Sequence, residues 1–196
     1  MSNIKSYTDK ELLERVKTLP TFKGFPNGVL DIWVRSNEDE FDRFDDKVYT
    51  FLCHGDEREP EFIMVCTGTT NAGSFGLKQF KTYNPKGCAV LKSDIIVYNS
   101  HVYGLHKGKP AYIQSFTVPF PYYRDGNMNN RCDEVGEVYT DRIGANCHRA
   151  GVFSTVISNW SVACLVRNQL SQFGNWLDFM IKRGKPNLSV CILKEF

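Results

Sequence analysis

The segment from residue 147 to residue 164 contains the side chains that thiol-based acyl transfer requires, namely Cys147, His148, Ser161 and Cys164. A thiolate is the reactive form, and an ordinary cysteine thiol with a pKa of about 8.5 needs a nearby base to react at neutral pH. His148 is the histidine closest to Cys164 in the sequence, and Ser161 offers a hydroxyl hydrogen bond. Backbone N–H groups at Ala163 and Cys164 would form an oxyanion hole. The segment therefore predicts a thiol–imidazole pair; the alternative is a buried structural cysteine beside a histidine that is satisfied elsewhere.

Other cysteine and metal chemistry is less favoured by the sequence. No two of the seven cysteines have C-x-x-C spacing, the strongest zinc signature. Zinc bound by Cys147, His148 and Cys164 is disfavoured because adjacent strand residues point to opposite faces. A papain-like pair of Cys88 with His148 would need the cysteine to begin a helix, and its surroundings read as a strand. Residues 125–136 lack the glycine and the glutamate that a calcium loop has at its sixth and twelfth positions. We therefore expect no metal and no cofactor.

The elements that position these residues are mainly strands. Strand patterns occur at 29–36, 48–54, 61–69, 88–99, 110–123, 136–148 and 187–196. One helix is predicted near the N-terminus, where Thr8 and Glu11 have capping-box spacing, and a second over 171–184, between Ser171 as N-cap and Gly184 as C-cap. This order predicts a β-dominated single domain with a helix on its surface.

The long polar segment at residues 71–87 is rich in glycine and reads as a loop. It joins two of the predicted strands, so the sequence predicts no regular element between them.

The composition excludes several classes of protein. The chain has 196 residues, enough for one domain with a sizeable core. Its 24 basic and 22 acidic residues give a net charge of +2, which offers no argument for binding nucleic acid. It contains no run of about 18 apolar residues, so no membrane span is expected. The N-terminal residues lack the apolar stretch of a signal peptide, so we expect synthesis in a cytoplasm, where thiols stay reduced.

Four short motifs carry a resemblance to a known family. They are GLHKGK at 104–109, YRDGN at 123–127, CHRAG at 147–151 and WSVAC at 160–164. Together with the turn that contains Gly184 and Pro186, this pattern resembles the catalytic core of the YkuD-type L,D-transpeptidases. It is similar above all to a divergent branch of that family found in bacteriophage genomes. The resemblance covers roughly residues 65 to 193.

The resemblance implies a β-rich α+β fold, namely a mixed β-sandwich or barrel of L,D-transpeptidase type with one surface helix after the catalytic cysteine. Residues 1–60 would be an N-terminal helical extension packed on the core. Residues 61–196 would be the L,D-transpeptidase-like domain.

The resemblance also implies roles for single residues. Cys164 would attack the carbonyl of the diaminoacyl–D-alanine bond of a peptidoglycan stem peptide and form a thioester. His148 would act as the base, and Ser161 would orient the pair. Attack on the thioester by an amine would make the protein a transpeptidase, and attack by water an L,D-carboxypeptidase or endopeptidase. Substrate contacts are implied at Arg149, Gly151, His106 and Arg167, although His106 also reads as a surface histidine between strands.

Two positions depart from the family pattern. Ala163 stands where a glycine usually precedes the nucleophile, and its methyl group would crowd the oxyanion site. Val166 stands where an arginine is common, and the nearest arginine is Arg167, one step later. These departures favour an alternative of another class, in which the chain is an inactive phage virion or structural protein, or a module that only binds peptidoglycan.

The expected setting follows from the resemblance and from the missing signal peptide. We expect a phage-encoded protein that cleaves or remodels the cell wall. It would be made in the host cytoplasm, associate with virion proteins, and act in the periplasm or cell wall.

Overall fold

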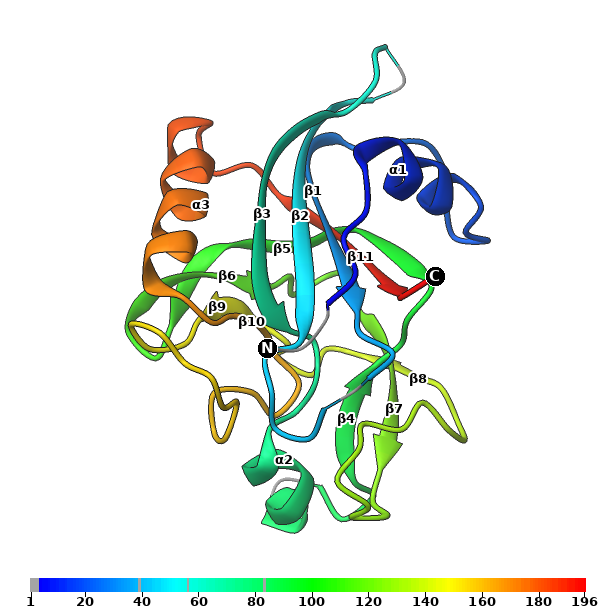
Figure 1. Ribbon diagram of the computed structural model, residues 1–196, viewed down its shortest axis with the longest axis vertical. Coiled ribbons are helices and arrows are strands. Elements are labelled where there is room, and N and C mark those ends of the chain that lie inside the picture. Colours follow the sequence, from blue (N-terminus) through cyan, green and yellow to red (C-terminus); the bar gives the residue numbers. More distant parts are fainter. Residues whose placement is uncertain (1–3, 39, 56, 83) are drawn as a thin grey trace.

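A closed barrel forms the centre of the molecule in the computed structural model, which describes residues 4–38, 40–55, 57–82 and 84–196 (Figure 1). Around the barrel the strands follow the order β1-β11-β5-β6-β9-β10-β3-β2. Their bounds are β1 (Asn27–Arg35), β2 (Asp46–His54), β3 (Glu61–Thr69), β5 (Ile95–His106), β6 (Lys109–Gln114), β9 (Cys147–Arg149), β10 (Leu165–Arg167) and β11 (Leu188–Lys194). The β1–β11 and β9–β10 pairs are parallel and the other pairs are antiparallel, so the sheet is mixed.

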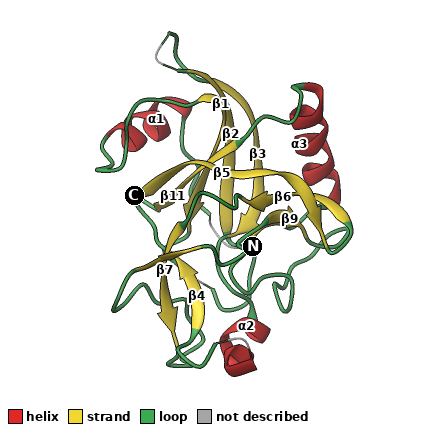
Figure 2. Ribbon diagram, turned by 180° about the vertical axis from the view of Figure 1, so that it is seen from behind, coloured by secondary structure: helices red, strands yellow, loops and turns green. Residues whose placement is uncertain are grey.

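A small second sheet and three helices complete the fold. The sheet has the order β4-β7-β8, with β4 (Cys88–Leu91), β7 (Phe120–Asp125) and β8 (Tyr139–Asp141). The helices are α1 (Asp9–Lys17), α2 (Ser74–Gln79), which continues into the 3₁₀ turn η1 (Phe80–Thr82), and α3 (Leu170–Lys182). Helices α1 and α3 lie on opposite sides of the barrel, and the small sheet and α2 lie at one end of it (Figures 1 and 2). The expected β-rich α+β class is confirmed.

Strand β1 shows why the barrel needs a helix outside it. Val29 and Trp33 belong to the apolar cluster inside the barrel, and the alternate residues Leu30 and Ile32 belong to a second cluster. Helix α1 contributes its own apolar face to that second cluster. A strand that is buried on both faces requires a cover on each. Helix α1 therefore supplies the outer cover of β1, β2 and β11.

The helix ends follow the predicted capping chemistry in part. Thr8 and Glu11 form the expected capping box at the start of α1. Helix α3 begins one residue before the predicted N-cap Ser171, because Gln169 takes the N-cap position without a side-chain hydrogen bond. Gly184 follows the helix with φ +77°, a left-handed conformation that glycine adopts without steric cost.

Each of three predicted strands is divided in the structure into two strands, and the two belong to different sheets. Residues 88–99 divide into β4 and β5 at Asp94, which has φ +53°. Residues 110–123 divide into β6 and β7, and residues 136–148 into β8 and β9. In each case one half pairs in the barrel and the other half pairs in the small sheet. The predicted loop at 71–87 contains α2 and η1 instead.

The domain boundary expected near residue 60 lies between β2 and β3. The barrel includes strands on both sides of this position, and the boundary itself stays a prediction. In the part of the chain that the structure describes, no helix is long and apolar enough to cross a membrane.

Candidate active site

Strands β9 and β10 place His148 and Cys164 on one face of the barrel wall. The strands pair in parallel, with Cys147 opposite Leu165 and His148 opposite Val166. Cys147 and Leu165 point into the core, where both are 0% exposed. Because side chains alternate along a strand, His148 and Val166 lie on the other face, and Cys164 packs with Val166 there. The predicted pair therefore comes from neighbouring strands, and Cys147 is not part of it.

The hydrogen bonds of His148 define its tautomer. Its Nδ1 lies 2.9 Å from the carbonyl oxygen of Arg149, an acceptor, so Nδ1 carries the ring hydrogen and Nε2 keeps a lone pair. The side chain is only 6% exposed, and within the described residues Nε2 is buried without a hydrogen-bond partner. Burial, followed by the nearby cationic and imidazole groups, lowers the pKa of His148 to about 4. The imidazole is therefore neutral at pH 7 and presents an unused acceptor.

Cys164 lies one residue before β10 and is partly buried. Its Sγ is 3.8 Å from the carbonyl oxygen of Gly144. Burial raises the pKa of the Cys164 thiol, while backbone hydrogen bonds from Asn146 and Ala163 and the charge of Lys107 act in the opposite direction. Within the described residues, no hydrogen bond joins the Cys164 thiol to the His148 imidazole.

Ser161 fixes the backbone of Cys164 through a hydrogen bond. It is buried, and its hydroxyl donates to the carbonyl oxygen of Cys164 at 2.9 Å. Its own carbonyl accepts from the N–H of Gly73 at 3.0 Å, which ties the segment to the start of α2. Ser161 therefore positions the chain that carries the thiol.

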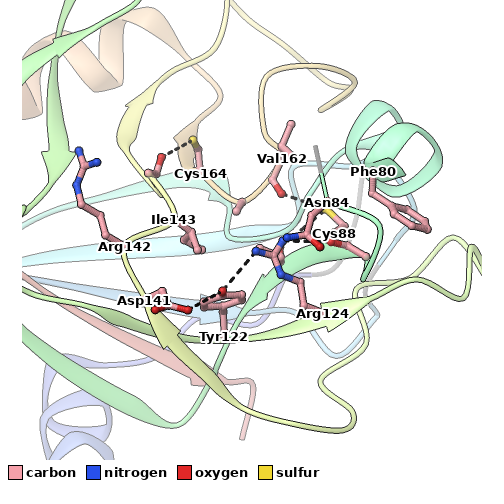
Figure 3. A pocket seen from close by; sticks show the side chains of 14 residues that line it. Phe80, Asn84, Cys88, Tyr122, Arg124, Asp141, Arg142, Ile143, Val162 and Cys164 are labelled. Atoms are coloured by element: carbon pink, nitrogen blue, oxygen red, sulfur yellow. Dashed lines mark hydrogen bonds between the residues drawn. The ribbon is translucent and has the colours of Figure 1, made fainter. Parts of the chain in front are cut away.

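A pocket of about 660 Å³ opens beside Cys164, between the barrel and the small sheet (Figure 3). Arg124 of β7 lies in its wall, where its guanidinium donates to the carbonyl of Gly87 at 3.1 Å and to the hydroxyl of Tyr122 at 3.3 Å. Arg142 also lines the pocket, but its side chain points away from Arg124 and lies over the ring of Phe116 (Figure 3). The pocket thus joins a thiol to one fixed cationic side chain.

A second, smaller pocket of about 120 Å³ lies on the side of His148. His106, at the end of β5, stacks on His148 with ring centroids 4.3 Å apart and the planes 6° from parallel. Trp160 and Pro110 also line this pocket. Cys164 lines the large pocket and His148 the small one, so the predicted pair stands between two cavities. His106 therefore does reach the site.

Lys107 is a residue of this site that the sequence patterns did not identify. It forms the tip of the β5–β6 hairpin and lines the small pocket. Its charge lowers the pKa of Cys164, His148 and His106. The Lys-Gly pair inside the motif GLHKGK predicts a two-residue turn, but it does not predict that the turn lies beside His148.

The other predicted substrate contacts have different positions. Arg149 lines the small pocket and donates to the carbonyl of Ala150 at 2.9 Å. Gly151 lies where an added Cβ would be 3.7 Å from the ring of Trp160. Arg167 is 0% exposed inside the barrel and lines neither pocket. The reason is strand alternation: the residue two after Cys164 shares the face of the thiol, and the residue three after it points inward.

Comparison of this chain with family models, with curated proteins and with solved structures found no match in any of the three.

Proposed function

We propose that this chain is a cysteine-dependent enzyme of L,D-transpeptidase type that acts on peptidoglycan stem peptides, with Cys164 as nucleophile and His148 as base. One observation carries the proposal. A thiol and a buried imidazole with an unused Nε2 lie on the same face of two adjacent parallel strands, beside a pocket large enough for a peptide segment. The motif resemblance supplies the substrate class.

The proposed reaction begins at the bond between the diamino acid and D-alanine. The Cys164 thiol gives its proton to Nε2 of His148, and Sγ bonds to the carbonyl carbon. The C–N bond then breaks, and the leaving amine takes the proton from the imidazolium, which leaves a thioester on Cys164. An amine or a water molecule releases the acyl group by the reverse proton transfers. The first outcome is transpeptidation and the second is hydrolysis.

Three contacts of the thiol act toward the charged form that this reaction needs, against the larger effect of burial. Burial raises the pKa of Cys164, and hydrogen bonds from the backbone of Asn146 and Ala163, together with the charge of Lys107, oppose that rise. Arg124, in the same pocket, would hold a carboxylate or a carbonyl of the acyl donor. Substrate binding has to bring Sγ and Nε2 within hydrogen-bond distance, because catalytic hydrogen bonds often form only in the complex.

The second candidate is a module on the same fold that binds peptidoglycan or serves in the virion without turnover. The net rise in the pKa of Cys164 and the missing Sγ–Nε2 hydrogen bond favour it. In either case we propose a phage protein that is made in the host cytoplasm, travels with the virion, and acts in the periplasm or cell wall.

Thiol reactivity separates the two candidates. The experiment measures the rate of iodoacetamide alkylation of each cysteine against pH, by mass spectrometry, in the wild type and in His148→Ala. Cys132 is the internal reference because it is also partly buried. An active site is expected to label Cys164 fastest, with an advantage that His148→Ala removes and that the control variant His54→Ala keeps. If Cys164 labels no faster than Cys132, the enzyme proposal fails and the binding role stands.

A further inference from the structure

The small pocket beside His148 is a compact site of its own. It lies between the tip of the β5–β6 hairpin, strand β9 and the segment that follows it. The tip is a two-residue turn in which Lys107 and Gly108 both have positive φ, at +49° and +75°. These angles are those of the type I′ turn, which matches the twist of paired strands. The hairpin therefore holds its end residues, His106 and Lys109, firmly at the pocket.

Two imidazoles offer this pocket complementary hydrogen-bonding groups. His148 presents the lone pair of Nε2, which is buried and unpartnered within the described residues. The side-chain amide of Asn146 lies 3.0 Å from Nδ1 of His106 and donates to it, so His106 carries its hydrogen on Nε2. A buried acceptor without a partner is destabilising, and a ligand that donates a hydrogen bond would remove that cost.

The charges around the pocket are of one sign. Lys107, Lys109 and Arg149 line it, and among its described lining residues none is acidic. Trp160, which is 39% exposed, and Pro110 add an apolar wall. A ligand that fits these groups carries an anionic end, a hydrogen-bond donor and a small apolar group. A volume of about 120 Å³ limits it to a few non-hydrogen atoms.

We propose that this pocket binds a small carboxylic acid with an amino or hydroxyl group on the next carbon, of the size of alanine or lactate. The carboxylate is held by Lys107, Lys109 and Arg149, and the N–H or O–H donates to Nε2 of His148. The methyl group lies against Trp160. An inorganic oxyanion is a poorer ligand because it leaves the apolar wall without a contact. The inference rests on the proposed function in one respect, because the Nε2 of His148 that holds the ligand is also the base of that reaction, but binding does not require the thiol to react.

The test is a ligand titration of the full chain, monitored by nuclear magnetic resonance of the indole N–H groups. Trp33 and Trp176 are fully buried, so the exposed Trp160 is the reporter, and Trp160→Phe assigns its signal. The probes are D-alanine, L-alanine and D-lactate. For ligands of this size we expect a saturable shift with a dissociation constant of about 1 mM. Alaninamide, which lacks the carboxylate, and propionate, which lacks the donor, are each expected to bind about tenfold more weakly.

Variants connect the signal to the pocket. Lys107→Gln and Arg149→Gln are each expected to weaken D-alanine binding by about tenfold. Lys10→Gln, at an exposed lysine of α1, is the matched control and is expected to bind as the wild type does. Cys164→Ala is also expected to keep full binding, so this proposal and the proposed reaction fail separately. No saturable shift with any acid, equal binding of alaninamide, or tighter binding of phosphate would overturn the inference.

Discussion

Removal of the Arg167 guanidinium is expected to destabilise the fold strongly while leaving both pockets in place. Arg167 donates to Asp31 at 2.7 Å and to Sγ of Cys147 at 3.0 Å, and it lies 4.0 Å from the ring of Trp176. Both members of the ion pair are 0% exposed. Arg167→Met leaves the Asp31 carboxylate buried, and among the described residues its one remaining side-chain partner is the hydroxyl of Thr50 at 2.6 Å. Breaking a buried pair in this way costs about 3–5 kcal/mol.

Urea unfolding of three variants tests this reasoning. Asp31→Asn combined with Arg167→Met removes both charges and keeps an acceptor for Thr50, so we expect it to be about 2 kcal/mol more stable than Arg167→Met alone. Lys17→Met removes one member of the exposed Lys17–Glu14 pair at 2.8 Å and is expected to unfold close to the wild-type urea concentration. A loss below about 1 kcal/mol for Arg167→Met would refute a structural role. If that variant instead loses ligand binding with unchanged unfolding, the substrate role implied by the motif resemblance is restored.

Two further predictions use the titrating groups. Burial lowers the pKa of His101 and of His148 to about 4, below the value of about 6.5 in the unfolded chain, so the unfolded state binds more protons between these values. The free energy of unfolding therefore falls as the pH is lowered from 6.5 to 4, by about 3 kcal/mol for each histidine. Urea unfolding measured against pH should show a smaller fall in this free energy for His148→Gln than for the wild type. Lys107→Ala is expected to raise the pKa of Cys164 and slow its alkylation severalfold at pH 7–8, because Lys107 favours the thiolate; an unchanged rate, equal to that of Lys10→Ala, would contradict this.

Local patterns identified the strands and helices whose burial is regular along the chain. Strands β1, β2, β3 and β11 and helices α1 and α3 fall within a few residues of their predicted positions. The divisions between β4 and β5, between β6 and β7, and between β8 and β9 were missed, because apolar residues continue across or near each of them. Sheet membership is a long-range property: β4 pairs with β7, while β5 pairs with β11. Apolar patterning along the chain does not encode that choice.

Helix α2 was missed for a related reason. Its sequence contains a glycine and spans only Ser74–Gln79, so local propensity does not predict a helix there. In the fold, Gly76 sits where an added Cβ would be 3.2 Å from the Cα of Val162 and 3.3 Å from Sγ of Cys88. The helix thus depends on close packing against the segment before Cys164, and only the tertiary structure reveals this contact.

The sequence identified two residues that the fold places on one face, and it did not identify the charged groups around them. The placement of His148 and Cys164 on a common face follows from strand alternation once β9 and β10 are paired. The contribution of Lys107 depends on the long β5–β6 hairpin, whose tip lines the small pocket with His148, and the residues around Lys107 were assigned to no strand. The two separate pockets depend on side chains from the small sheet and from the hairpin, which no local pattern brings together.

The offset of one residue between Val166 and Arg167 decides which side chain lies on the face of the thiol. Val166 is fully buried with Phe44, Ala150 and Ile157, and Cys164 packs against this apolar cluster. An arginine at position 166 would need to enter that cluster, so the cationic group near the thiol has to come from another element. Lys107, at the tip of the hairpin, takes that role. An ammonium on a flexible stem exerts a weaker directional effect than a guanidinium fixed on the next strand. We therefore expect the alkylation rate of Cys164 to depend on where the hairpin tip holds Lys107.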